Sequence, residues 1–338
     1  MEAVDVRGRF VWHELMTRDV AGAKKFYAKL VGWKTLAWPL DPSYTVCHAD
    51  IGPTAGIMEI PADLPADMPA HWVQYIGTRD VDGTADAAVR AGGSVLKAPS
   101  DMQGAGRYAI IKDPQGAPFG ILDPENARPE PPGPPPLGTF SWHELATTDN
   151  EAAFAFYSAL FGWDAIERMD MGPSGVYLIF GQNGARRGGM YIKPADYQGP
   201  PNWLPYANVP SADQGFTLAM EGGAKQMIAP MEVPGGGRIA AVADPTGAAF
   251  AIHSMPAGSA AAAEAAPKPK AAAKPKPKAK AKARPKARAK PKAKAKAKPA
   301  RKPAAKKKVT RKPAKKAARK AARKSAPKTK SKASMRKK

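Results

Sequence analysis

Two segments of this chain, 130 residues apart, share one pattern of residues, and this repeat is the strongest constraint on the fold. The first begins Phe10-Val-Trp-His-Glu-Leu and runs to Asp19; the second begins Phe140-Ser-Trp-His-Glu-Leu and runs to Asp149. A Phe-Tyr pair, a leucine and a Gly-Trp pair follow each of them at identical spacing. A repeat this long indicates that the folded part of the chain is a duplicated domain.

The repeat extends to the end of each half, where Asp-Pro-x-Gly-Ala at Asp113 recurs at Asp244. Asp19 is a good N-cap and Gly32 a good helix-ending glycine, which predicts a helix between them. Alternation and turn residues predict that each half is two βαβββ units, giving an α+β class. In the first half we expect helices after Asp19 and at 82–91, and strands at 10–16, 33–38, 44–49, 55–60, 72–76, 94–98, 107–112 and 118–122.

Composition sets the domain boundaries. Residues 125–137 are rich in proline and predict a semi-rigid linker. We therefore expect one domain at 8–124 and a second at 138–256. Residues 257–338 hold 34 lysines and arginines but one acid, Glu264, so the rest of the chain is mildly acidic although the whole carries a net +24. This tail has no aromatic residue, and we expect it to be disordered alone.

The order of units, with the late Asp-Pro-x-Gly turn, resembles the vicinal oxygen chelate superfamily: glyoxalase I, bleomycin-resistance proteins and extradiol dioxygenases. More narrowly, it is similar to tandem glyoxalase-like bacterial proteins. The resemblance covers nearly all of residues 8–254. It implies that paired units curl into an open sheet around a cup that usually holds a divalent metal.

The sequence departs from the family at the metal. The first ligand position that the resemblance implies falls on Trp12 and Trp142, and the closing glutamate position falls on Gly120 and Ala251. A metal site needs three or four converging ligands. We therefore predict no metal site and no cofactor, with an unrecognised divalent metal left as an alternative.

Alternation along the first strand places Phe10, Trp12, Glu14 and Met16 on the cup face, and the same holds for Trp142 and Glu144. A carboxylate on an apolar floor is costly unless it is paired. We weigh a structural glutamate, bonded to a neighbouring strand or to Arg107 or Arg238, against a ligand anchor or catalytic general base. The candidate ligand-binding residues are Trp12, Trp142, Trp72, Trp203, Arg107 and Arg238, and the candidate catalytic residues are Glu14 and Glu144.

The histidines fit a metal site poorly. His13 and His143 are one residue out of register with the cup, so they should face the helices. His253 is a lone histidine, for which a structural role is favoured. Trp72 and Trp203 are open to two readings, as core residues or as pocket walls.

The lysine-rich tail resembles the C-terminal tail of linker histone H1 in composition. Cations on a flexible chain release counterions from DNA and bind it without reading sequence. We predict non-specific DNA binding, with RNA or polyphosphate as alternatives and no membrane role. The candidate contacts are Lys282, Arg284, Lys286, Arg288, Lys306, Lys307, Lys308, Arg311, Lys312, Lys315, Lys316, Arg319, Lys320, Arg323 and Lys324.

Three functions therefore stand: a metal-free small-molecule-binding protein tethered to DNA, an enzyme of this superfamily (lyase, hydroxylase or dioxygenase-like), or a nucleoid-compacting protein with a structural body. The single cysteine, Cys47, and a first segment without an apolar run favour a cytoplasmic, nucleoid-associated protein. Fusion of two domains makes a monomer with an internal pseudo-dimer plausible.

Overall fold

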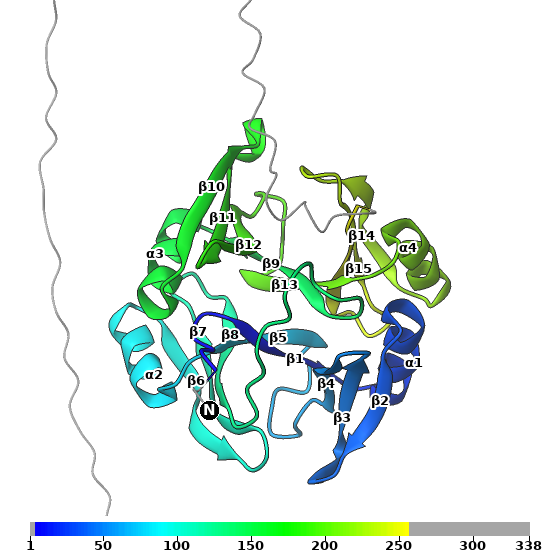
Figure 1. Cartoon of the computed structure of the whole chain (residues 1–338), viewed down its shortest axis with the longest axis horizontal. Coiled ribbons are helices and arrows are strands. Elements are labelled where there is room, and N and C mark those ends of the chain that lie inside the picture. Colours follow the sequence, from blue (N-terminus) through cyan, green and yellow to red (C-terminus); the bar gives the residue numbers. More distant parts are fainter. Residues whose placement is uncertain (1–3, 257–338) are drawn as a thin grey trace, which may run out of the picture. The chain divides into compact units, whose positions relative to one another are not determined.

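The computed structural model describes residues 4–256, and the lysine-rich tail with all its candidate DNA contacts lies outside the described residues. The described part consists of two eight-stranded curled sheets, each with two helices (Figure 1). The repeat predicts a duplicated α+β domain and the family resemblance implies paired units curled around a cup, and both expectations are confirmed. None of the helices in residues 4–256 is long and apolar enough to cross a lipid bilayer.

The first sheet has the strand order β2-β3-β4-β1-β5-β8-β7-β6, with β1 and β5 at its centre. Its β1 is parallel to β4 and antiparallel to β5, and β5 is parallel to β8. The elements are β1 (Phe10–Thr17), α1 (Val20–Val31), β2 (Lys34–Trp38), β3 (Asp41–Ala49), β4 (Gly52–Glu59), β5 (His71–Gly77), α2 (Val81–Arg90), β6 (Ser94–Met102), β7 (Gly106–Lys112) and β8 (Pro118–Pro124).

The second sheet repeats this topology in the order β10-β11-β12-β9-β13-β16-β15-β14. The second domain has one element that the first lacks, a short 3-10 helix at Gly172–Ser174. The elements are β9 (Phe140–Thr147), α3 (Asn150–Phe161), β10 (Asp164–Asp170), β11 (Val176–Gln182), β12 (Ala185–Ile192), β13 (Asn202–Asn208), α4 (Ala212–Glu221), β14 (Lys225–Glu232), β15 (Arg238–Ala243) and β16 (Ala249–Ser254).

Local signals place the helices as the sequence predicts. The Asp19 carboxylate accepts a hydrogen bond from the Gly22 amide at 2.8 Å, and Asp149 caps α3 in the same way. Gly32 ends α1 at φ 85°, a left-handed conformation in which glycine has no Cβ penalty. The N-cap and helix-ending roles of these residues are therefore confirmed.

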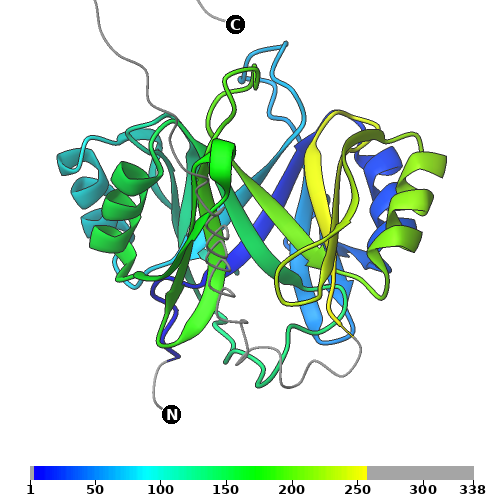
Figure 2. The ribbon, with the colours of Figure 1, turned by 90° about the horizontal axis from the view of Figure 1, so that it is seen from above.

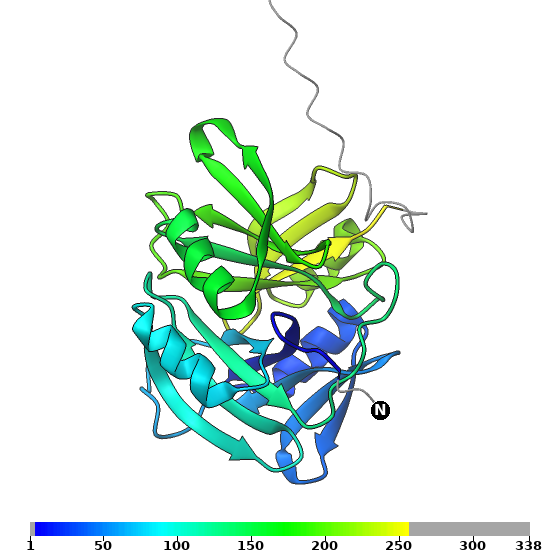
Figure 3. The ribbon, with the colours of Figure 1, turned by 60° about the vertical axis from the view of Figure 1, so that its left-hand side comes forward.

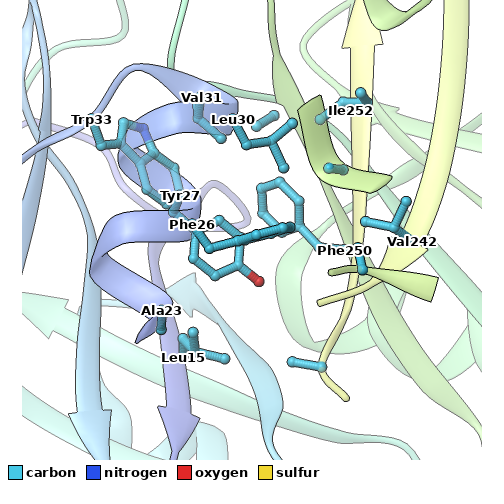
Figure 4. Packing of buried hydrophobic residues seen from close by; sticks show 14 of the residues in the cluster. Leu15, Ala23, Phe26, Tyr27, Leu30, Val31, Trp33, Val242, Phe250 and Ile252 are labelled. Atoms are coloured by element: carbon cyan, nitrogen blue, oxygen red, sulfur yellow. The ribbon is translucent and has the colours of Figure 1, made fainter. Parts of the chain in front are cut away.

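Each domain completes the core of the other. Figure 2 shows α1 beside α4 on one side of the molecule and α2 beside α3 on the opposite side, and Figure 3 brings the side with α2 and α3 forward. One buried cluster joins Tyr27 and Trp33 of the first domain to Val242, Phe250 and Ile252 of the second (Figure 4). A second cluster of the same kind joins the other halves of the two sheets, so the backs of the sheets meet in apolar interior while their concave faces point away from each other (Figure 1).

Two buried hydrogen bonds cross this interface in a symmetric way. The Tyr27 hydroxyl donates to the Asp244 carboxylate at 2.8 Å, and the Tyr157 hydroxyl donates to Asp113 at 3.0 Å. Each aspartate belongs to the Asp-Pro-x-Gly turn of the other domain and also accepts backbone amides of that turn, as Asp113 does from Gly116. The helix of one domain is thus fixed to a turn of the other.

A histidine pair lies where the two central strands meet. His13 Nε2 is 2.9 Å from His143 Nε2, so one ring donates and the other accepts. Each imidazole stacks on a phenylalanine of the other domain, with ring centroids 3.6 Å apart for both His13–Phe140 and Phe10–His143. Burial lowers the pKa of both imidazoles, that of His143 to about 3. The pair is therefore neutral and faces the interior.

We expect the histidine pair to make the protein acid-sensitive. An unfolded histidine has a pKa near 6.5. Below that pH the unfolded chain therefore binds protons at these two histidines, whereas the folded chain does not. The resulting loss of stability should approach about 1.4 kcal/mol per pH unit for each histidine that stays neutral when folded. The double variant His13→Gln, His143→Gln should lose stability less steeply between pH 6.5 and 4 in urea unfolding. Equal slopes for the two proteins would contradict this.

Candidate ligand-binding site

The concave face of the first sheet, which we call cup 1, has a carboxylate on its floor. Glu14 lies at the middle of β1 and is only 6% exposed. It accepts hydrogen bonds from the hydroxyls of Tyr44 on β3, at 2.8 Å, and Tyr75 on β5, at 3.0 Å. The Trp12 indole N–H donates in turn to the Tyr44 hydroxyl at 2.9 Å. Four side chains from three strands therefore form one connected network.

Burial dominates the electrostatics of this network. It raises the pKa of Glu14, and the hydrogen bonds from Tyr44 and Tyr75 oppose that rise only in part. The pKa values of Tyr44 and Tyr75 lie well above the usual range, because both phenols are buried and both stand beside the Glu14 carboxyl. Both tyrosines therefore keep their protons and act as donors to the carboxylate.

Two glycines make room for the tyrosine rings. A Cβ added to Gly56 on β4 would stand 1.8 Å from the Tyr44 hydroxyl oxygen, and one added to Gly120 on β8 would stand 2.2 Å from the Tyr75 ring. Each ring thus crosses the sheet directly over a glycine. Gly120 is also the position where the family resemblance places a metal-binding glutamate, so the tyrosine ring takes that ligand's space.

The concave face of the second sheet, cup 2, keeps most of this network. Trp142 donates to Tyr177 at 2.9 Å and Tyr177 donates to Glu144 at 2.9 Å, with the Tyr177 ring over Gly189. Burial raises the pKa of Glu144, as it does for Glu14. The fourth member differs, because Ala251 stands where cup 1 has Gly120. The Tyr206 hydroxyl faces Glu144 but lacks the regular hydrogen bond that Tyr75 makes.

Cup 1 opens into a cavity of about 1300 Å³. Its lining includes Glu14 and a set of aromatic side chains, namely Trp12, Trp38, Tyr44, Tyr75 and Tyr108. The proline-rich linker forms a further wall: the Arg128 carbonyl accepts from Arg9, and the Pro135 carbonyl accepts from Asn208 of the second domain. The linker predicted as a spacer therefore also borders cup 1.

The structure places Trp12 and Glu14 together in cup 1, and Trp142 and Glu144 together in cup 2, as the sequence suggests. It places the other candidates elsewhere. Trp72 and Trp203 lie on the interdomain side, where their indoles donate to Tyr27 and Tyr157. They are core residues in this structure.

Arg107 and Arg238 form exposed ion pairs with Asp82 and Asp213, away from the glutamates. The arginine partner considered for Glu14 is therefore absent from its surroundings, and tyrosines take its place. His253 lies 3.0 Å from the Ser141 hydroxyl, in a structural contact.

One orientation expected from alternation is wrong. Phe10 and Phe140 do not share the cup face with Trp12 and Trp142 but stack on the histidines of the interface. The register of β1 shifts between Phe10 and Trp12, and β9 shifts at the equivalent place. A bulge inserts one residue and turns the preceding side chain to the other face.

The tyrosines are the residues that sequence reasoning missed. Tyr75 and Tyr206 recur in the repeat, but their hydroxyls could not be assigned to a partner from spacing alone. Tyr44 and Tyr177 are 133 residues apart, whereas equivalent residues of the first strand of each half are 130 apart, so a comparison at constant spacing does not align the two tyrosines. The glycines of the next strand, Gly56 and Gly189, give the signal that could have found them.

The metal-ligand positions implied by the family do not fit a metal here. The implied positions are Trp12 and Gly120 in the first sheet and Trp142 and Ala251 in the second. The residue that pairs with both of them on the strand between is a tyrosine, Tyr75 or Tyr206. Within residues 4–256, no three His, Cys, Asp or Glu side chains come together as a metal-binding group. One carboxylate that already accepts two phenol hydrogen bonds is a poor donor set for a divalent cation.

Paired βαβββ units around a cup define the class of protein. The sequence pattern of the Glyoxalase/Bleomycin resistance protein/Dioxygenase superfamily matches residues 9–121 and 139–252. The chain belongs to this superfamily, with two tandem domains.

Relatives support the same family. "Putative glyoxylase CFP32" of Mycobacterium tuberculosis is 33% identical over 71% of this chain and 92% of its own length. "Anthracycline biosynthesis protein DauV" of a Streptomyces species is 31% identical over 77% of this chain and 98% of its own length. Among solved structures, the Mn(II)-bound glyoxalase from Novosphingobium aromaticivorans has a similar fold, with a TM-score of 0.53 and 16% identity over 73% of this chain and 82% of that one.

The glycine beneath Tyr75 gives a direct test of the network. Gly120→Ala should push the ring away from the sheet, weaken its hydrogen bond to Glu14 and destabilise the protein by about 1–3 kcal/mol, the usual cost of overpacking. Urea unfolding measures this. In a Tyr75→Ala background the same change should cost much less, because no ring lies over the glycine. An equal cost in both backgrounds would contradict the account.

Proposed function

We propose that this chain is a small-molecule-binding protein of the glyoxalase superfamily that holds its ligand without the family metal. The observation that carries the proposal is the network on the floor of cup 1, which fills the family's ligand positions with tryptophan, tyrosine and glycine. A cavity of about 1300 Å³ lined with aromatic rings suits a flat apolar ligand. The likeness to DauV, whose name connects it to anthracycline biosynthesis, supports a small-molecule ligand.

The proposal includes a tether to DNA. The segment from Lys268 to Lys338 is a polycation with no aromatic side chain, and Val309 and Met335 are its only aliphatic side chains larger than alanine. Such a segment binds phosphate through counterion release, has no ring with which to stack on bases, and has too little apolar surface to enter a bilayer. It would hold the two cups near DNA in the cytoplasm, at the nucleoid.

An enzyme of this superfamily is the second candidate, and one observation favours it. Burial raises the pKa of Glu14 and of Glu144, which is how proteins prepare a carboxyl group for general acid–base work near neutral pH. In that reading the two tyrosines would orient the carboxyl group of cup 1.

Metal analysis tests the proposed absence of the family metal. Purified full-length protein, dialysed without chelator, should carry well under one divalent ion per domain by plasma mass spectrometry. Adding Mn²⁺, Zn²⁺ or Fe²⁺ should leave its melting temperature unchanged, because the described residues offer no converging ligand set. About one tightly held ion per domain would refute metal-free binding.

Gel retardation tests the tether. Full-length protein should retard duplexes of unrelated sequence equally, and affinity should fall steeply between 50 and 200 mM salt, by roughly 10³-fold or more if several phosphates are contacted. Protein ending at residue 256 should retard none of them. Equal retardation by the truncated protein would place DNA binding in the body and overturn the tether.

A further inference from the structure

Glu14 is a buried carboxylate that lacks a cation. None of the ion pairs formed within residues 4–256 includes Glu14 or Glu144. Lys97 is the basic side chain that acts electrostatically on Glu14, and its effect is smaller than that of burial or of the two tyrosine hydrogen bonds. That lysine is exposed, and its ammonium lies 4.8 Å from the centre of the Tyr108 ring. A buried carboxylate without a counter-charge is costly, and its two phenol donors offset that cost only in part.

The protons of the network are already committed. The Trp12 N–H serves Tyr44, and the Tyr44 and Tyr75 hydroxyls both serve Glu14. What remains for a ligand on this floor is a set of lone pairs: those of the carboxylate and those of the phenol oxygens. Cup 1 therefore offers hydrogen-bond acceptors at the point where the cavity reaches Glu14.

The aromatic walls of the cavity also favour a positively charged ligand. The aromatic rings that line the cavity present electron-rich faces, which attract organic cations. Trp38 and Tyr44 meet edge to face with centroids 5.8 Å apart, and Tyr75 and Tyr108 lie 6.3 Å apart, so the rings form adjoining walls near Glu14.

Two arginines also line the cavity, on its linker side. Arg9 donates to the carbonyl oxygens of Asp5 and Arg128, and Arg128 donates to that of Ile51. Both guanidinium groups are therefore engaged with the backbone at the rim, and the carboxylate is the charge on the floor.

We propose that cup 1 binds a planar organic cation, an aromatic ring system bearing a protonated amine or quaternary nitrogen, with the positive charge paired to Glu14 inside the ring of aromatic side chains. This inference rests on the proposed function, since it names the ligand class of the same cup. The cation supplies the counter-charge that the fold itself does not place beside Glu14. In cup 2, Ile228 and Ile239 replace Lys97 and Tyr108, while Tyr191 stacks beside Tyr177 with ring centroids 6.3 Å apart, so the two cups differ in their rings.

Three planar tricyclic probes of different charge test this. N-methylacridinium is a permanent cation, acridone is neutral and anthracene-9-carboxylate is an anion. Titrated into the full-length protein at pH 7.5, the cation should quench tryptophan fluorescence and bind at least about tenfold more tightly than the other two. Tenfold corresponds to about 1.4 kcal/mol, less than a buried charge pair commonly contributes. This comparison uses the wild-type protein and does not depend on the folding of any variant.

A matched pair of variants locates the charge. Glu14→Gln should weaken binding of N-methylacridinium about tenfold or more while changing acridone binding less than threefold. Glu59→Gln, an exposed carboxylate on the neighbouring strand β4, should behave as wild type. Affinity of the wild type for the cation should fall from pH 7.5 to 5, because protonation of Glu14 competes with the ligand, and Glu14→Gln should remove that dependence.

The outcomes separate the two proposals. If acridone or the anion binds as tightly as the cation, or if Glu14→Gln weakens all three probes alike, the cation inference fails and small-molecule binding stands. If no planar probe binds at all, the proposed function fails with it. Loss of cation selectivity in Glu144→Gln but not in Glu14→Gln would move the site to cup 2 and overturn the assignment to cup 1.

Discussion

The hydrogen bonds of Tyr27 and Tyr157 across the domain interface are the contacts on which the rest of the structure depends. Each tyrosine hydroxyl donates to a buried aspartate of the other domain and accepts from a tryptophan of its own, Trp72 or Trp203. An unpaired partner in such a place would cost about 1–3 kcal/mol. Because each buried apolar cluster draws residues from both domains, neither domain has a complete core alone. The concave faces are consequently left free to bind a ligand.

The sequence predicts the frame of this molecule well because the frame depends on local signals that are repeated. The caps Asp19 and Asp149, the ends of α1 and α3, and the inward turn of His13 all follow from spacing and residue type. The orientations of Phe10 and Phe140, which the sequence predicts wrongly, have a different origin. A bulge between Phe10 and Trp12 shows only in the pairing of β1 with β5, which no periodicity within one strand reveals.

Sequence predicts only the part of the candidate site that lies on one strand, because the rest depends on how strands pair. Trp12 and Glu14 share a face by alternation, which local sequence shows. Their partners come from β3 and β5, and a hydroxyl reaches Glu14 only because Gly56 and Gly120 let the rings lie flat on the sheet. That arrangement depends on cross-strand register and on the absence of two Cβ atoms far along the chain. Trp72 and Tyr75 illustrate the limit: three residues apart on one strand, they face opposite sides by alternation, but spacing alone does not tell which side is the core and which the cup.

The two halves have diverged in a way that follows from the packing. Residues at the interface come in equivalent pairs, such as His13 with His143 and Asp113 with Asp244, because each member completes a contact made by the other domain. A change in one of them disturbs both halves. Cup residues are less constrained, because the Glu14 network and the Glu144 network each use side chains of one domain only. Gly120 can therefore become Ala251, and Tyr108 can become Ile239, without disturbing the shared core. Duplication thus preserves the shared interior while it leaves two cups free to differ in charge and in their rings. Cup 1, with its regular Tyr75–Glu14 bond and its linker wall, is the better formed of the two for a charged aromatic ligand.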